Sequence, residues 1–121
     1  MTKHVLVVDD DPDILDAIEW MLVDAGYEVR TSDKGDSVDN LRDTNGGLPD
    51  LIILDILLSG KDGRTICKNF KSRPDTRRIP IVMISAHPGA AGSARAVGAD
   101  DFVAKPFDVD VLLAAVERHL R

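Results

Sequence analysis

Aspartate, serine and lysine residues follow short apolar runs at four places in the chain. Asp9 and Asp10 follow the first run, and Asp55, Ser85 and Lys105 follow three later ones. Clustered carboxylates raise one another's pKa unless a cation relieves the repulsion, and Mg²⁺ prefers such oxygen ligands. A carboxylate can also act as a nucleophile, while a lysine and a hydroxyl can bind phosphate oxygens. These residue types predict magnesium-assisted phosphoryl transfer if the fold brings them together.

The apolar runs indicate how the fold could do so. They do not alternate with polar residues, which is typical of strands buried on both faces of a parallel sheet. These runs comprise residues 5–8, 51–54, 81–84 and 102–104. Residues 27–31 are more mixed and suit an edge strand. Because parallel strands end at one edge of a sheet, where open α/β folds place their ligands, we expect the polar residues to share one crevice.

The segments between the runs contain capping residues and apolar spacings that predict helices. Asp11 can cap a first helix that has Pro12 in its first turn and is closed by Gly26, although Asp11 could instead extend the acidic cluster. Asp108 can cap a last helix. The apolar stripe of the first helix comprises Ile14, Ile18, Met21, Leu22 and Ala25, and that of the last comprises Val109, Leu112, Leu113, Val116 and Leu120.

Two further helices are predicted in the middle of the chain, over residues 37–43 and 63–71. The second offers Ile66, Cys67 and Phe70 as its apolar face and must end before Pro74. Strand and helix thus alternate, which predicts a three-layer α/β sandwich with right-handed crossovers.

Composition limits the class of protein. With 121 residues, 44% hydrophobic and 30% charged, the chain suits one folded domain. A net charge of -6 argues against nucleic-acid binding, and no apolar run is long enough to span a membrane. The one cysteine, Cys67, cannot form an internal disulfide and most simply packs as a small hydrophobe in a reducing compartment. We expect a cytoplasmic protein.

Several short motifs occur together in a specific order and spacing. They are Val7-Val8-Asp9-Asp10, Leu54-Asp55 with Asp62-Gly63, Ile84-Ser85-Ala86, Gly98-Ala99-Asp100-Asp101 and Lys105-Pro106-Phe107. With these motifs the chain resembles, over essentially its full length, the receiver domain of two-component response regulators, the CheY-like group. The resemblance implies a flavodoxin-like five-stranded parallel sheet in the order 2-1-3-4-5 with five helices, two on one face and three on the other. It also implies that residues 1–121 form a single receiver domain, with no output domain in this chain.

The resemblance implies a role for each matching position around the metal. Asp55 would be the phosphoacceptor. Asp10 would bind Mg²⁺ directly and Asp9 through water, with Leu57 contributing its backbone carbonyl; Mn²⁺ is an alternative ion. A histidine kinase or a histidine phosphotransfer protein would donate the phosphoryl group, and a downstream protein would receive the signal.

Other positions would bind or sense the phosphoryl group. Lys105 and Ser85 would contact its oxygens. Phe102 matches the aromatic switch position that turns inward when Ser85 moves, and the Lys105–Pro106 peptide bond would be cis.

The chain also departs from the usual family pattern. Ser59 stands where many receivers have proline, and Ser85 where threonine is commoner. Residues 87–93 look shorter than usual and are rich in glycine, which disfavours helix, so we predict a short or frayed fourth helix. His87, two residues after Ser85, lies where the family can influence hydrolysis of the aspartyl-phosphate, although a solvated loop histidine explains it slightly better.

Three other functions compete with this interpretation. An aspartate-nucleophile phosphatase usually has a second aspartate two residues after its nucleophile, where this chain has Leu57. An unphosphorylated pseudo-receiver acting as a docking module normally loses an acidic or lysine position, and none is lost here. A flavin binder would need a phosphate-cradling first loop, which is missing. The best interpretation is a signal carrier rather than a turnover enzyme.

Overall fold

A five-stranded parallel sheet forms the middle of the molecule. The structure is a computed structural model that describes residues 2–33, 47–58, 60–87 and 89–120. The strands of this sheet are β1 (His4–Val8), β2 (Glu28–Ser32), β3 (Leu51–Asp55), β6 (Ile81–Ser85) and β7 (Asp101–Ala104). The four apolar runs lie within β1, β3, β6 and β7, and the mixed segment 27–31 overlaps β2, which begins one residue later than predicted, at Glu28. β3 and β6 are buried along their whole length, as expected for strands covered on both faces.

The strand order in this sheet is β2-β1-β3-β6-β7, which differs in numbering from the expected 2-1-3-4-5. Two short strands that the sequence did not predict cause the difference. β4 (Leu57–Leu58) and β5 (Lys61–Asp62) pair antiparallel in a separate two-stranded sheet directly after β3. Gly60, between them, has a φ of 73°, a conformation that glycine adopts without steric cost.

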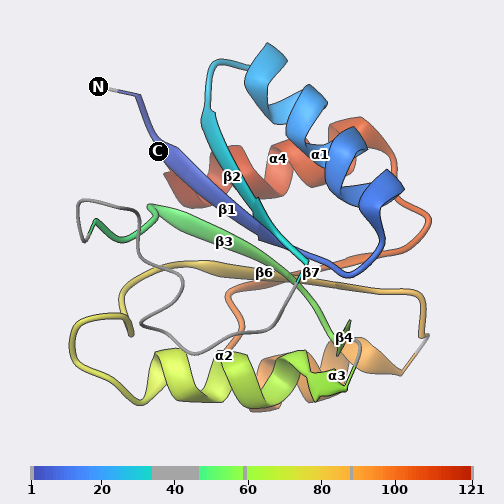
Figure 1. The fold of residues 1–121 in the computed structure, drawn as a ribbon. Coiled ribbons are helices and arrows are strands. Elements are labelled where there is room, and N and C mark those ends of the chain that lie inside the picture. Colours follow the sequence, from blue (N-terminus) through green and yellow to red (C-terminus); the bar gives the residue numbers. More distant parts are fainter. Residues whose placement is uncertain (1, 34–46, 59, 88, 121) are drawn as a thin grey trace.

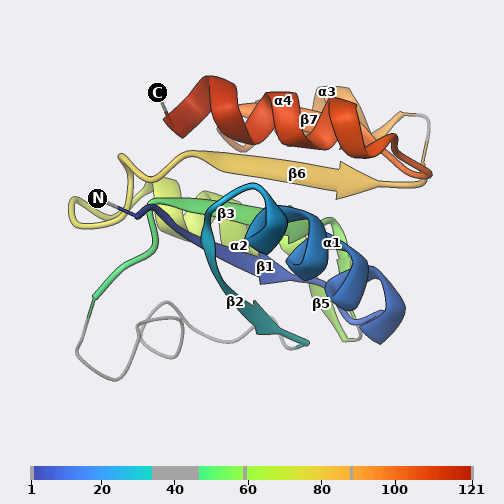
Figure 2. The ribbon, with the colours of Figure 1, turned by 90° about the horizontal axis from the view of Figure 1, so that it is seen from above.

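Helices cover both faces of the central sheet (Figures 1 and 2). α1 (Pro12–Asp24) and α4 (Val109–Leu120) pack on one face, and α2 (Gly63–Lys71) and α3 (Ala90–Ala96) on the other. The structure thus describes four helices instead of the expected five, and the predicted helix over residues 37–43 lies outside the described residues. None of the described helices is both long and apolar enough to cross a membrane.

The helix ends follow the sequence signals. Asp11 caps α1 by accepting a hydrogen bond from the Asp13 N–H at 3.0 Å, and Pro12 begins the helix. Gly26 follows its end with a φ of 98°. α2 has the predicted bounds, and its predicted apolar face is buried.

The two faces of the sheet each have an apolar core. One core joins β1, β3 and β6 to α2 and α3, and the other joins the opposite faces of these strands to α1 and α4. Two details of the predicted inner faces were wrong. Val109, the first residue of α4, is 53% exposed, and the buried residues of that helix are Leu112, Ala115 and Val116. Ala25, predicted in the apolar stripe of the first helix, follows the end of α1 and is exposed.

α3 is short, as predicted. It has seven residues, and Gly89 at its start makes no side-chain capping bond. Its buried side chains are only Ala90 and Ala94, so the helix contributes little apolar surface to the core. Whether α3 frays remains a prediction.

Candidate functional site

Asp9 lies at the end of β1, where the chain leaves the sheet to start α1. Its backbone N–H donates to the Ser32 carbonyl at 3.1 Å, which continues the pairing with β2. Its side chain is completely buried, and Oδ1 accepts a hydrogen bond from the Asp11 N–H at 2.9 Å. The first turn of α1 therefore fixes the orientation of the Asp9 carboxylate.

Asp55 is the last residue of β3, the strand next to β1. Its side chain is 8% exposed, and Oδ1 accepts a hydrogen bond from the Leu57 N–H at 3.3 Å. The Ile56 N–H donates to the Ile84 carbonyl at 3.1 Å, so the chain stays attached to β6 just beyond Asp55. The carboxylate is held at the carboxyl edge of the sheet, where parallel α/β folds place their ligands.

Lys105 forms ion pairs with both buried carboxylates, those of Asp9 and Asp55. Its Nζ lies 2.9 Å from Asp9 Oδ2 and 3.2 Å from Asp55 Oδ2. The Lys105 N–H also donates to the Ser85 carbonyl at 2.8 Å, and the Lys105–Pro106 peptide bond is cis, as the resemblance implied. Residues from the ends of three different strands thus meet in one cluster, as the sequence predicted.

Burial and charge act against each other in this cluster. Burial raises the pKa of Asp55, and so does the negative charge of Asp9, while the Lys105 ammonium opposes both. Burial by itself would lower the pKa of Lys105, but the hydrogen bond and the charges of Asp9 and Asp55 outweigh it, and the pKa of Lys105 is raised. Lys105 is therefore a cation at neutral pH.

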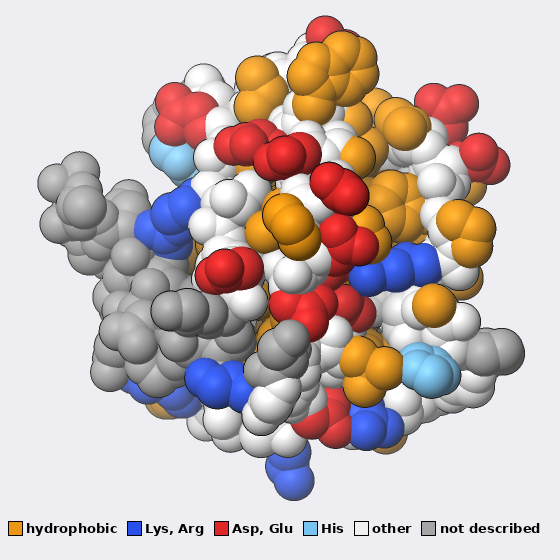
Figure 3. Space-filling model, turned by 45° about the vertical axis from the view of Figure 1, so that its right-hand side comes forward, with side chains coloured by type: hydrophobic (Ala, Val, Ile, Leu, Met, Phe, Trp, Pro, Cys, Tyr) orange, Lys and Arg blue, Asp and Glu red, His pale blue; other side chains and the backbone are white. Residues whose placement is uncertain are grey.

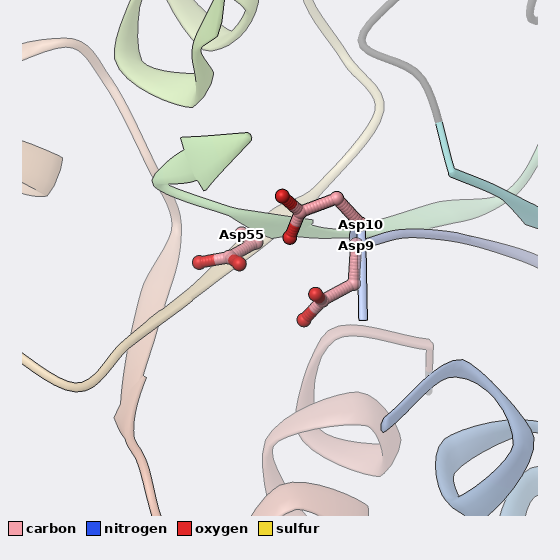
Figure 4. A group of neighbouring side chains, drawn as sticks. All are labelled: Asp9, Asp10 and Asp55. Atoms are coloured by element: carbon pink, nitrogen blue, oxygen red, sulfur yellow. The ribbon is translucent and has the colours of Figure 1, made fainter. Parts of the chain in front are cut away.

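Asp10 completes an acidic group. One carboxylate oxygen from each of Asp9, Asp10 and Asp55 lies within 4.8 Å of the others (Figure 4). In the space-filling view, acidic side chains gather across the middle of this face beside a basic one (Figure 3). Three converging carboxylates are the donor set of a hard divalent cation, so the residues present fit Mg²⁺.

Ser85 and Phe102 lie on the neighbouring strands β6 and β7. Ser85 is buried at the end of β6, and its Oγ accepts a hydrogen bond from the His87 N–H at 3.1 Å. A pocket of about 340 Å³, lined in part by Leu57, Ser85 and His87, opens between α2 and α3. Phe102 is half-buried in β7 and packs against the core beneath these helices.

Asp62 and Gly63 belong to the motifs that carry the family resemblance, and they have a structural role that the sequence did not indicate. Gly63 begins α2, and its N–H donates to the Ile56 carbonyl at 2.6 Å. A Cβ at this position would lie 2.1 Å from the Asp55 carbonyl oxygen, so the close approach requires glycine. Asp62 caps α2 through the Arg64 N–H at 2.9 Å. A glycine at the first position of a predicted helix was the signal that could have revealed this packing.

Comparisons with known proteins agree on one family. A family model described as the response regulator receiver domain matches residues 5–117. The chain is 37% identical over 124 residues to the phosphate regulon transcriptional regulatory protein PhoB of Rhizobium meliloti (strain 1021), and it spans 53% of that relative's length.

Solved structures support the same grouping. A putative response regulator from Chloroflexus aurantiacus J-10-fl superposes with a TM-score of 0.89 at 36% identity, covering 99% of this chain and 98% of that one. The receiver domain of NtrX from Brucella abortus gives a TM-score of 0.84 at 40% identity, covering 96% and 97% of the two chains.

Proposed function

The chain belongs to the response regulator receiver domain family, and we propose that it accepts a phosphoryl group on Asp55 from a histidine kinase or a histidine phosphotransfer protein. The observation that supports this most directly is the position of Lys105. Its ammonium contacts the carboxylates of both Asp9 and Asp55, at 2.9 and 3.2 Å. A cation beside the nucleophile compensates the charge of an incoming phosphoryl group, which is the main requirement of this chemistry.

In the proposed transfer, an oxygen of the Asp55 carboxylate forms a bond to phosphorus. The bond between phosphorus and the donor histidine nitrogen breaks at the same time, and the imidazole takes up a proton from solvent. Lys105 keeps its proton throughout and neutralises a phosphoryl oxygen, since its pKa is raised by its two carboxylate partners. Asp55 thereby becomes an aspartyl-phosphate.

Asp10 would bind Mg²⁺ directly, together with Asp55 and the Leu57 carbonyl, and Asp9 would bind it through water; Mn²⁺ could take the same place. When bound, the ion supplies positive charge that offsets the three carboxylates and the phosphoryl oxygens. The fold places these carboxylates close together, and ligands that are held in place by the fold favour binding of the ion.

Ser85 is suited to sense the phosphoryl group. Its Oγ accepts a hydrogen bond from the His87 N–H, so the hydroxyl hydrogen can still be donated. We propose that this hydrogen is donated to a phosphoryl oxygen, which draws Ser85 toward Asp55. Phe102 on the adjacent strand would then turn inward, shifting the population of the domain toward a signalling conformation.

In this proposal residues 5–117 act as a cytoplasmic receiver domain. The domain carries a signal to a downstream protein. It would accelerate only its own phosphorylation and dephosphorylation, without turning over a substrate.

The proposal is tested by incubating the protein with acetyl phosphate and Mg²⁺ and measuring the intact mass. We expect one added phosphoryl group in the wild type and none in Asp55→Asn or in the presence of EDTA. Asp16→Asn, a change at an exposed aspartate of α1, serves as the matched control and should be labelled normally. If the wild type is not labelled, the protein is better explained as a docking module that is not phosphorylated. If Asp55→Asn is labelled, the phosphoacceptor is a different residue.

A further inference from the structure

The basic residues of this acidic protein are concentrated in one segment. Seven of the fifteen Lys and Arg residues lie between Lys61 and Arg78, a stretch with only two acidic residues. This stretch contains α2 and the loop that leads to β6. By contrast, α1 on the opposite face of the sheet has four acidic residues and no basic one (Figure 1). The net charge of -6 therefore conceals a strong separation of charge across the sheet.

Some of these cations have structural partners. The Lys71 Nζ bonds to Asp100 at 2.7 Å and to the Ile79 carbonyl at 2.9 Å, and Arg64 forms a two-pronged contact with Asp62. The positive charges of Lys71 and Arg64 are already paired with carboxylates of the fold. These two residues therefore have a structural role and are not assigned a binding function.

Lys68, Arg77 and Arg78 differ from these residues and together are called the basic surface here. All three are exposed, and their side chains form no ion pair with any residue that the structure describes. Lys68 lies in the last turn of α2, where a cation favours the helix dipole. That effect falls off within a turn, so it does not account for Arg77 and Arg78, which lie beyond the helix end.

The backbone that carries the two arginines is held firmly. The buried Thr76 hydroxyl donates to the Phe70 carbonyl at 2.7 Å, and the Arg77 N–H donates to the Arg73 carbonyl at 2.9 Å. The Lys71 Nζ also reaches the Arg77 carbonyl at 3.3 Å. A loop fixed in this way loses little entropy when its side chains bind a partner.

The basic surface lies away from the acidic group. In Figure 1 the loop between α2 and β6 is at the end of the sheet where the strands begin, whereas Asp9 and Asp55 lie where β1 and β3 end. A molecule bound to the loop would therefore leave the acidic group accessible.

We propose that Lys68, Arg77 and Arg78 form a docking surface for a short acidic segment of a partner protein, and that docking there does not depend on Asp55. Guanidinium groups pair with carboxylates through two parallel hydrogen bonds, which suits Asp and Glu side chains. A short acidic segment can contact these three cationic side chains without reaching the acidic parts of the protein surface. A long polyanion such as DNA, or an anionic membrane, would extend over that remainder and be repelled.

The test measures binding of a fluorescein-labelled oligoglutamate peptide by fluorescence anisotropy at low ionic strength. The double variant Arg77→Glu/Arg78→Glu is compared with Lys3→Glu/Arg95→Glu, which changes the net charge equally at exposed positions outside the basic surface. We expect the first variant to bind about tenfold more weakly than the wild type and the control to bind nearly as well as the wild type. Added salt should weaken wild-type binding.

Two parallel measurements complete the experiment. Single-stranded DNA and phosphatidylglycerol vesicles replace the peptide as alternative probes, and labelling by acetyl phosphate is measured in both variants. The inference expects weaker binding of DNA and vesicles than of the peptide, and normal labelling of Arg77→Glu/Arg78→Glu. It is overturned if the wild type does not bind the peptide, if both variants lose binding equally, or if DNA or vesicles bind more tightly.

Discussion

The Nζ of Lys105 lies 2.9 Å from Oδ2 of Asp9, although the two residues are 96 positions apart in the chain. Asp9 is completely buried, and an isolated carboxylate in such a place would be strongly destabilising. The contact shows that the fold supplies its own cation to the acidic group. Removing that cation should therefore affect stability as well as phosphoryl transfer.

Lys105→Met is expected to lower the free energy of unfolding by about 2 kcal/mol in EDTA, because it leaves Asp9 and Asp55 buried without a cation. Added Mg²⁺ should reduce this deficit, since the ion can offset the same carboxylates. Urea unfolding followed by circular dichroism measures both effects. Lys3→Met, at an exposed lysine, is the control and should change little. Equal stability of Lys105→Met and the wild type in EDTA would contradict this interpretation.

Gly63→Ala is expected to destabilise the protein by about 2 to 3 kcal/mol. The added Cβ would lie 2.1 Å from the Asp55 carbonyl oxygen, and a backbone atom cannot yield as a flexible side chain does. The start of α2 and the end of β3 would have to separate, so labelling of Asp55 by acetyl phosphate should also slow.

Gly92→Ala provides a matched comparison within α3. No atom lies within 4 Å of the added Cβ, and replacing a helical glycine should stabilise the protein by about 0.5 to 1 kcal/mol. Chemical unfolding of the two variants gives changes of opposite sign if the packing around Gly63 is as described. A Gly63→Ala protein as stable as the wild type would show that α2 can move without cost.

The sequence was sufficient to predict the five strands of the central sheet and the acidic group. The four apolar runs do not alternate with polar residues, which predicted a buried parallel sheet. Each run is followed by Asp9, Asp55, Ser85 or Lys105, which predicted that these residues meet at the carboxyl edge of that sheet. Val109 was misassigned to the inner face because an apolar residue in the first turn of a helix can have the right spacing and still be exposed.

The remaining features depend on tertiary contacts that periodicity does not encode. The β4–β5 pair is only two residues on each side, too short for a pattern. The contact between Gly63 and Asp55 depends on how closely α2 approaches β3. The charge of the basic surface was visible in the sequence, but the absence of ion pairs between it and the described residues depends on where Asp62 and Asp100 lie in the fold.

Asp62→Ala is expected to cost about 1 kcal/mol of stability, because it removes the oxygen that accepts the Arg64 N–H at the start of α2. The ion pair between Asp62 and the Arg64 guanidinium is exposed and should contribute much less. Arg64→Ala, measured by the same urea titration, separates the two contributions. A loss in Arg64→Ala as large as that in Asp62→Ala would assign the stability to the ion pair.

Cys67 gives a prediction for alkaline pH. Burial raises the pKa of its thiol from 9.0 to about 11, so the folded protein keeps the thiol neutral while the unfolded chain already ionises. The stability from this neutral thiol is fully present below pH 9 and is lost as the pH rises through 11, by about 3 kcal/mol in total. In Cys67→Ala this part of the pH dependence should disappear. The cavity left by the missing sulfur should also lower the stability by an amount that does not depend on pH.

The measurement compares urea unfolding of the wild type and Cys67→Ala at several pH values between 8 and 11, so that the pH dependence common to both proteins cancels in the difference. Ellman's reagent at pH 8 should react slowly with the native protein and rapidly with the urea-unfolded chain. A pH-independent difference in stability, or fast reaction of the native thiol, would show that Cys67 is solvated.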